Sequence, residues 1–213
     1  MNSIGKITLT SLLVFVLSLF TACGAPAGDA ETPPADVPAA SLGTVNTDGA
    51  IRIQIDVKDY GFIEAELYPM VAPETVANFM TLISDGFYDG LTFHRTINTF
   101  MIQGGDPLGN GKGNSGTTIN GEFANNGFPN GLSHTRGVLS MARGGRDMNS
   151  ASCQFFIVQQ DATFLDGDYA AFGLVTSGMD IVDSIALNTP VEDDNGTVLS
   201  ENQPIINSIV IVE

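Results

Sequence analysis

The chain has 213 residues, which is enough for one domain of ordinary size with additional segments. It carries 24 Asp and Glu against 8 Lys and Arg, and a formal charge of −16 repels nucleic-acid phosphates, so DNA or RNA binding is not expected. Two cysteines and two histidines form no framework or cluster, so we expect no disulfide scaffold, no metal site and no cofactor.

The first 22 residues have the pattern of a secretory signal peptide. Lys6 precedes an apolar stretch from Ile7 to Ala22, which is interrupted by Ser and Thr and is too short to span a bilayer. Residues 20–23, Phe-Thr-Ala-Cys, resemble a bacterial lipobox, in which Cys23 is diacylated and becomes the mature N-terminus. The alternative is a plain signal peptide followed by an incidental cysteine. We therefore expect an extracytoplasmic protein that a lipid at Cys23 anchors to the membrane, facing the periplasm or the cell surface.

Residues 23–47 differ in composition from the rest of the chain. They contain four prolines together with Ala, Asp and Glu, and almost no large apolar residues, so they cannot form a core. This segment is interpreted as a lipid-anchored, Pro- and Ala-rich linker, and residues 48–213 are left for the folded domain.

The domain begins with two strand patterns and a helix pattern. Apolar and polar residues alternate over 51–57 and again over 62–68, which predicts a hairpin. Pro73 suits the first position of a helix and Gly86 the position after its end, and the apolar residues between them follow helical spacing.

The rest of the domain consists of short strand patterns and one more helix. The helix is expected near residues 179–186. The further strands are expected near residues 93–95, 100–103, 137–142, 152–158, 170–175 and 205–212. Many short strands with two helices indicate a mostly β fold, a closed β-barrel with helices covering its ends.

Several patterns in the domain carry little functional weight. Residues 109–116 formally match a dinucleotide-binding glycine pattern, but no helix follows and no βαβ unit surrounds them, so we interpret them as a surface loop. A Ser-His-Asp hydrolase triad could be drawn with His94 or His134, but no Gly-x-Ser-x-Gly elbow supports one. Residues 195–197 have the form of a glycosylation sequon, without expected meaning in a bacterial lipoprotein.

Three stretches rich in apolar, amide and glycine residues follow one another in the chain. The first, 93–106, contains Arg95, and taken alone it could be a core hairpin with a solvated arginine. The second is 137–142, and the third consists of 152–157, 164–167 and 172–173. In this combination, order and spacing, the chain resembles the cyclophilin family of peptidyl-prolyl cis-trans isomerases over about residues 50–213.

The resemblance implies a fold and a set of functional residues. The fold is a closed eight-stranded antiparallel β-barrel capped by two α-helices, with a peptide groove on one face. Arg95 matches the catalytic arginine, and Gln103 matches the glutamine that orients this arginine and the substrate. Four apolar residues match the proline pocket: Phe100, Met101, Phe156 and Leu165.

Four more positions complete the substrate-binding set that the resemblance implies. Ala142 and Arg143 match the groove backbone that pairs with the peptide. Phe164 stands where many members have Trp, and Tyr169 where many have His. Bacterial relatives vary at both places, so neither departure indicates a loss of activity, although Phe164 leaves tight binding of the drug cyclosporin unsupported.

The resemblance therefore implies a peptidyl-prolyl cis-trans isomerase that acts as a monomer on proline-containing segments of exported proteins and assists their folding. The alternative is a non-catalytic chaperone or scaffold that binds proline-containing peptides on the same fold. The intact Arg95 favours the enzyme, because a pure binder has less need of it. The sequence does not specify the client proteins, the residue preferred before proline, or the type of cell envelope.

Overall fold

The computed structural model describes residues 45–212 of the chain. The predicted signal peptide, the lipidation site at Cys23 and nearly all of the linker lie outside the described residues. Among the residues that are described, no helix is both long enough and apolar enough to cross a bilayer.

Eight antiparallel strands form one curled sheet, in the order β3-β4-β6-β5-β7-β2-β1-β8. The strands are β1 (Ile51–Val57), β2 (Gly61–Leu67), β3 (Phe93–Ile97), β4 (Met101–Gly104), β5 (Val138–Met141), β6 (Phe155–Val158), β7 (Ala171–Ser177) and β8 (Ile206–Ile211). The helices are α1 (Pro73–Ser84) and α2 (Met179–Asn188), with short 3₁₀ turns η2 (Ala124–Asn126), η3 (Thr163–Leu165) and η4 (Ser200–Asn202). The two predicted helices and the eight predicted strand regions are confirmed.

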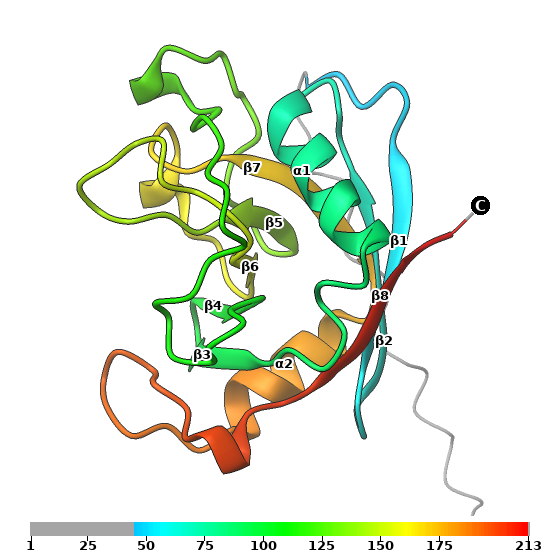
Figure 1. Ribbon diagram of the computed structural model, residues 1–213, viewed down its shortest axis with the longest axis vertical. Helices are drawn as coiled ribbons and strands as arrows, with labels where there is room; N and C mark the ends of the chain where they lie inside the picture. The colour runs from blue at the N-terminus through cyan, green and yellow to red at the C-terminus, as the bar shows by residue number, and fades with distance from the viewer. Residues whose placement is uncertain (1–44, 213) are drawn as a thin grey trace, which may run out of the picture. The chain divides into compact units, whose positions relative to one another are not determined.

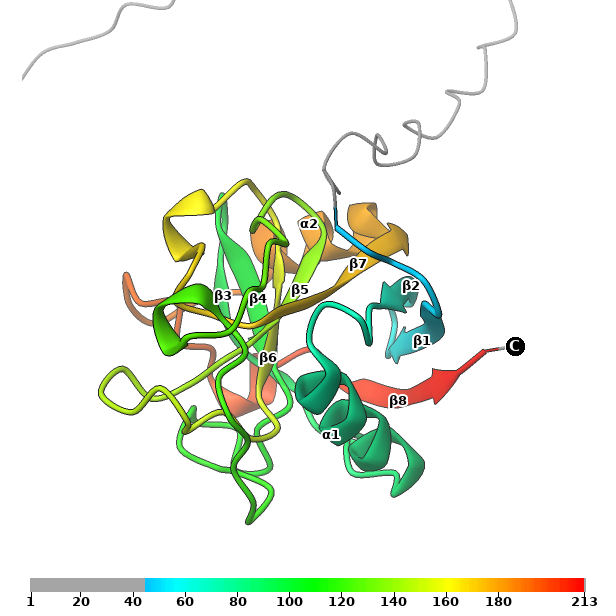
Figure 2. The same ribbon diagram turned by 90° about the horizontal axis from the view of Figure 1, so that it is seen from above.

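The sheet curls around its core, and the two helices lie at opposite ends of the curl (Figure 1). Figure 2 shows β3, β4, β6 and β5 side by side, across the molecule from β1, β2 and β8. β1 and β2 pair so that Ile53 lies opposite Ala65 and Ile55 opposite Ile63, and all four side chains are buried. The alternating pattern thus places one face of this hairpin in the core.

An aromatic cluster under α1 forms the centre of the larger core. The ring of Phe79 lies within 5.3 Å, centroid to centroid, of the rings of Tyr88, Phe155 and Phe172. Aromatic pairs at this spacing stabilise the fold beyond the area that they bury. α1 is thereby fixed against strands that come from distant parts of the chain.

The N-terminus of α1 is capped by a residue far away in sequence. Ala72 at the N-cap offers no side-chain hydrogen bond, and instead the backbone N–H groups of Glu74 and Thr75 donate to the two carboxylate oxygens of Glu122 at 2.9 and 2.8 Å. Glu122 is buried. A carboxylate in this place satisfies free N–H groups and meets the positive end of the helix dipole.

The prediction of a closed barrel is wrong, because the edge strands β3 and β8 do not pair and the sheet is a half-barrel. The free edge of β3 is instead occupied by the loop at 195–198, where the N–H of Thr96 donates to the carbonyl of Gly196 at 2.9 Å. The start of β8 and the residues before it bond to residues 90–93 at the start of β3, where Thr92 and Ile205 form an isolated bridge. One strand edge offers one row of hydrogen-bonding groups, so the loop leaves no place for β8.

Candidate active site

The hairpin of β3 and β4 brings Arg95 and Gln103 together. They lie directly opposite each other in the antiparallel register, next to a bulge between Phe93 and Arg95. The guanidinium Nη1 of Arg95 donates to Oε1 of Gln103 at 3.2 Å. A bulge re-aims side chains relative to strict alternation, and here it lets Phe93 enter the core while Arg95 stays at the surface of the site.

The other side of the guanidinium is held by a loop that joins α2 to β8. Arg95 Nε donates to the backbone carbonyl of Asn195 at 2.7 Å, and Nη2 donates to Oδ1 of the same residue at 3.2 Å. Burial lowers the pKa of Arg95 and nearby Asp193 raises it, and the group remains a cation. Three of the five guanidinium N–H groups are engaged by described residues, so two can face a ligand.

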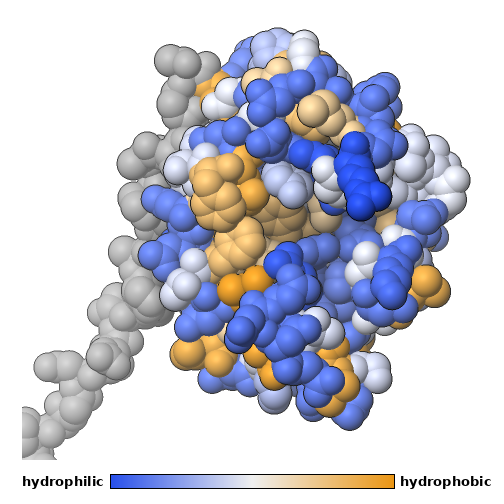
Figure 3. Space-filling view, turned by 90° about the vertical axis from the view of Figure 1, so that its left-hand side faces the viewer, coloured by the Kyte–Doolittle hydropathy of each residue, from blue (hydrophilic) through white to orange (hydrophobic). Residues whose placement is uncertain are grey.

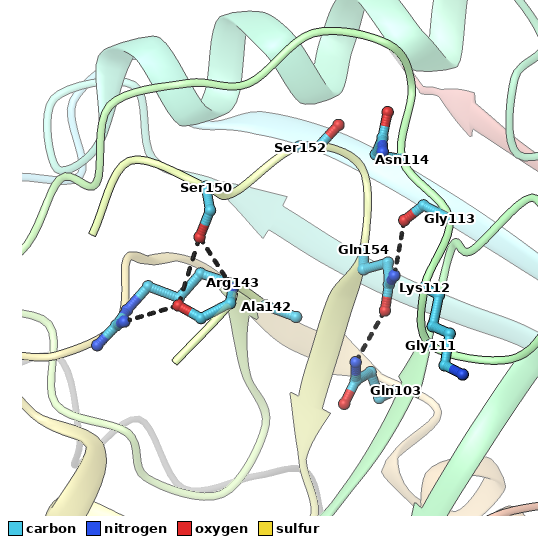
Figure 4. Close-up of a pocket in the computed structure, with 11 residues that line it drawn as sticks. Gln103, Gly111, Lys112, Gly113, Asn114, Ala142, Arg143, Ser150, Ser152 and Gln154 are labelled. Carbon is cyan, nitrogen blue, oxygen red and sulfur yellow. Dashed lines mark hydrogen bonds between the residues drawn. The ribbon is translucent and has the colours of Figure 1, made fainter. Parts of the chain in front are cut away.

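A chain of amides fixes the orientation of Gln103. Its Nε2 donates to Oε1 of Gln154 at 3.0 Å, and Nε2 of Gln154 donates to the carbonyl of Gly113 at 2.9 Å (Figure 4). Position 113 must be glycine, since an added Cβ would collide with Asp106, whose carboxylate accepts four backbone N–H groups of the adjoining 108–112 loop and so orders it. The acceptor oxygen of Gln103 is therefore turned toward Arg95.

Phe100 lies in the turn between β3 and β4, not in the strand as predicted, because β4 begins at Met101. Thr99 has a positive φ of 66°, and its N–H donates to Oδ1 of Asn98 and to Oε1 of Gln159. A left-handed residue at this place is unusual for threonine, so the turn is held by these contacts. It directs Phe100 out of the strand alternation and toward Phe164, with ring centroids 5.5 Å apart.

All ten residues predicted to act on or bind a substrate line one cavity of about 310 Å³. They are Arg95, Phe100, Met101, Gln103, Ala142, Arg143, Phe156, Phe164, Leu165 and Tyr169. Met101, Phe156 and Leu165 are buried, whereas Phe164 is 71% exposed. On the face that carries η3 and the 190–197 loop, apolar side chains gather in a hollow bordered by hydrophilic ones (Figure 3).

Arg143 does not project freely into the cavity. Its guanidinium lies 5.1 Å from the ring centroid of Phe123 and 4.9 Å from that of Tyr169, and its Nε donates to the carbonyl of Asp168 at 2.8 Å. These contacts fix Tyr169, whose ring stands edge-on to Phe156. The side chain of Arg143 thus supports one wall of the cavity by cation–π contacts.

A second cavity of about 270 Å³ adjoins the first and shares Gln103, Ala142 and Arg143 with it. Figure 4 shows Lys112 on the loop along one side and Ser150 on the other. The described lining contains two cationic residues and no carboxylate, although the chain as a whole is strongly acidic.

Three features of the site were missed from sequence. Gln154 directly precedes β6 and lies two positions before Phe156, so an extended reading of this stretch with alternating side chains could have identified it. The surface loop predicted at 109–116 also forms a wall of the second cavity, which its glycine-rich sequence does not indicate. Asn195 is 100 positions from Arg95, and no local signal connects the two.

Comparison with known proteins agrees with this geometry. Residues 52–212 match the family model described as cyclophilin type peptidyl-prolyl cis-trans isomerase/CLD. Peptidyl-prolyl cis-trans isomerase B of Bacillus subtilis is 45% identical over 145 residues, which cover 68% of this chain and 92% of the relative. The peptidyl-prolyl cis-trans isomerase of Helicobacter pylori is 44% identical over 134 residues, covering 62% of this chain and 78% of that protein.

A solved structure shows the same fold. It is the crystal structure of a Cryptosporidium parvum cyclophilin type peptidyl-prolyl cis-trans isomerase in the presence of the dipeptide Ala-Pro, with a TM-score of 0.66 and 32% sequence identity. The match covers 76% of this chain and 99% of the solved one. With the family model spanning nearly the whole described domain, the chain belongs to the cyclophilin-type peptidyl-prolyl cis-trans isomerase family.

Proposed function

We propose that the protein catalyses cis–trans exchange of X–Pro bonds in exported proteins, at the outer side of the membrane to which its N-terminus is tethered. The observation that carries the catalytic part is the apolar cavity with the fixed guanidinium of Arg95 beside it. Proline-containing segments of unfolded or partly folded chains are the substrates, and the protein acts as a monomer without a cofactor.

The reaction needs no proton transfer and no covalent bond to the enzyme. An X–Pro bond favours trans by only about 0.5–1 kcal/mol, yet the isomers exchange over roughly tens to hundreds of seconds. The barrier of roughly 18–20 kcal/mol is the amide resonance lost when the bond twists. A catalyst must therefore stabilise the twisted form more than either planar form.

Arg95 supplies this differential stabilisation. In the planar amide the prolyl nitrogen's lone pair is delocalised and accepts a hydrogen bond poorly, whereas in the twisted form it is localised. One of the two remaining N–H groups of Arg95 donates to it there, in a cavity where little water competes. Lysine cannot replace Arg95, because only the planar fork donates to Gln103, Asn195 and the substrate at once.

The rest of the cavity anchors the proline while the preceding carbonyl rotates. Met101, Phe156 and Leu165 hold the ring on the buried floor, and Phe100 covers it from the turn. The N–H of Ala142 is already bonded to the carbonyl of Gln154, so the carbonyl of Ala142 and the backbone of Arg143 pair with the peptide. This anchoring holds the planar and the twisted forms alike and so contributes to binding, whereas the hydrogen bond from Arg95 lowers the barrier, with about 1.4 kcal/mol needed for each tenfold acceleration.

The test is the exchange rate of an X–Pro peptide, measured by exchange NMR with the fragment that begins at Val45. We expect acceleration by the wild type and a loss of about tenfold or more in kcat for both Arg95→Ala and Arg95→Lys. The control Arg52→Ala changes an exposed arginine on β1 and keeps the wild-type rate. A wild type without acceleration, or Arg95→Ala at full rate, refutes the enzyme and leaves a binding module.

Membrane attachment has a separate test. The signal pattern and the cysteine at its end support a mature chain that starts with acylated Cys23, and the Pro-rich segment then spaces the enzyme from the bilayer. Mass spectrometry of protein extracted from membranes should find diacylglyceryl-modified Cys23 as the first residue, and Cys23→Ala should release the protein into the soluble fraction. A mature wild-type chain that begins at another residue contradicts the proposal.

A further inference from the structure

His134 lies just before β5 in a chain of hydrogen bonds that the isomerase mechanism does not use. Its Nδ1 is 2.8 Å from Oδ1 of Asp166, and its Nε2 is 2.9 Å from Oγ of Ser140. This is the order of groups in a serine hydrolase. However, the side chain of Ser140 is fully buried, so no substrate reaches its hydroxyl, and the arrangement needs another explanation.

The protonation of the three groups follows from their neighbours. Burial acts to raise the pKa of Asp166, but hydrogen bonds from Ser133 and His134 outweigh it and hold the pKa below its usual value. Burial lowers the pKa of His134, against the opposing effect of Asp166. A neutral imidazole therefore donates from Nδ1 to the carboxylate and accepts at Nε2 from the Ser140 hydroxyl.

These contacts connect His134 to three parts of the proline cavity. The imidazole is stacked on the ring of Phe156, with centroids 6.1 Å apart and planes inclined by 15°. Ser140 lies on β5, paired with Phe156 across to β6 and two positions before Ala142. Asp166 directly follows η3, the turn that presents Phe164 and Leu165 to the cavity.

We propose that His134 is a positioning residue of the isomerase, whose imidazole sets the distance between Phe156 on β6 and Leu165 on η3 and so fixes the width of the proline cavity. The proposal rests on the proposed function of this cavity. The two walls belong to different strands and turns. The Ser133 hydroxyl and the N–H of His134 also donate to Asp166, but the imidazole bonds to this carboxylate and at the same time stacks on Phe156.

The expected effect is on binding more than on the rate at saturation. The proline ring is held in the planar and the twisted forms alike, so a change in cavity width alters ground-state and transition-state binding together. Arg95 acts only on the twisted form, so its loss lowers kcat. A displaced wall and a lost catalytic group therefore leave different kinetic signatures.

The test uses the full-length protein with two variants of the chain. His134→Phe keeps a ring against Phe156 and removes both hydrogen bonds, and Ser140→Ala removes only the bond to Nε2. We expect the dissociation constant of an Ala-Pro peptide, measured by NMR titration, to rise about tenfold in His134→Phe and less in Ser140→Ala. In both variants the fold-change in kcat relative to the wild type should be smaller than the fold-change in the dissociation constant.

Tyr88→Phe is the matched control, because it also removes one buried hydroxyl hydrogen bond, to the carbonyl of Cys153. Tyr88 belongs to the aromatic cluster under α1, whereas the proline cavity is built on a separate cluster of buried residues. It should lower stability and leave peptide binding unchanged. The proposal is overturned if folded His134→Phe and Ser140→Ala bind the peptide as the wild type does, or if Tyr88→Phe weakens binding as much as Ser140→Ala. Should His134→Phe not fold, Ser140→Ala against Tyr88→Phe decides alone.

Peptide binding is measured independently of catalysis, so the two proposals fail separately. A wild type that binds the peptide but does not speed its exchange refutes the proposed enzyme and still permits the comparison of variants. A wild type that catalyses exchange while the variants match it in binding keeps the enzyme and removes the role of His134.

Discussion

The guanidinium of Arg95 is held on two sides, by Gln103 eight positions away on the next strand and by Asn195 a hundred positions away in a loop. Gln103 is oriented through Gln154, and Asn195 engages both Nε and Nη2 of Arg95. An amide side chain offers a donor at one end and an acceptor at the other, so its partner decides which end faces the arginine. The orientation of Arg95 and Gln103 therefore depends on residues outside the proline cavity, namely Gln154 and Asn195.

This arrangement predicts the effect of changing Gln154. Gln154→Met keeps the volume but removes the acceptor for Gln103, whose amide can then turn its nitrogen toward Arg95. One hydrogen bond contributes about 0.5–1.5 kcal/mol, so we expect kcat to fall about two- to tenfold. Gln154→Glu keeps an acceptor for Gln103 and should retain more of the rate. Exchange NMR at saturating peptide measures both, and equal rates for Met and wild type would exclude the orienting role.

The sequence predicts the residues that line the cavity better than the residues that hold them in position. The resemblance to the cyclophilin family names all ten lining residues, eight within the three motifs and Arg143 and Tyr169 beside them. Phe100 was placed in a strand because nothing in the sequence shows that Thr99 adopts a positive φ. Asn195 was missed because a contact between residues so distant in the chain has no local pattern.

At the scale of elements, α1 depends on a residue that is not part of it. Glu122 provides both acceptors at the N-terminus of α1, and the helix in turn carries Phe79 into the aromatic cluster. Loss of the Glu122 cap should therefore weaken the aromatic cluster as well as the first turn of α1.

We expect Glu122→Gln to lower the free energy of unfolding by about 1–3 kcal/mol. The amide can accept only one of the two N–H groups, and it brings no negative charge to the helix end. Urea denaturation measures the effect as a lower midpoint with an unchanged slope. Glu192→Gln, an exposed glutamate in the α2–β8 loop, is the control and should lie within error of the wild type.

The open edge of the half-barrel could not be predicted from sequence patterns, although the strands and helices could. Periodicity and turn signals locate the strands and both helices, because these depend on neighbouring residues. Closure depends on what occupies the free edge of β3, and that is an irregular loop around Gly196 with no strand pattern of its own. The position is restricted to glycine, since φ is 79° and an added Cβ would collide with the carbonyl of Thr96.

At the scale of the whole molecule, two buried histidines make stability depend on pH. Burial lowers the pKa of His94, in spite of Asp106, and burial lowers the pKa of His134. In the unfolded chain a histidine takes up a proton near pH 6.5, whereas the folded protein does so only at lower pH. Their contribution is complete above about pH 6.5 and is lost as the pH falls through the range between the two values.

Urea denaturation at pH 7.5 and pH 5.5 measures this dependence, and the wild type should be less stable at the lower pH. The imidazole nitrogens of His94 make no hydrogen bond to any described residue, so His94→Leu leaves no partner unpaired and should reduce the difference between the two pH values. The carboxylates of Asp106 and Asp166 have lowered pKa values and add a further loss only below about pH 4. A pH dependence unchanged in His94→Leu would contradict the assignment to this residue.

The burial of Cys153 affects how the protein can interact with chains that carry free thiols. The side chain is buried, and burial raises the pKa of its thiol to about 11, so it forms almost no thiolate at neutral pH. Chains with free cysteines that are still folding would form mixed disulfides with a reactive thiolate on a protein that binds them. An isomerase domain whose sole thiol is silent can hold such chains through many rounds of binding without being covalently trapped by them.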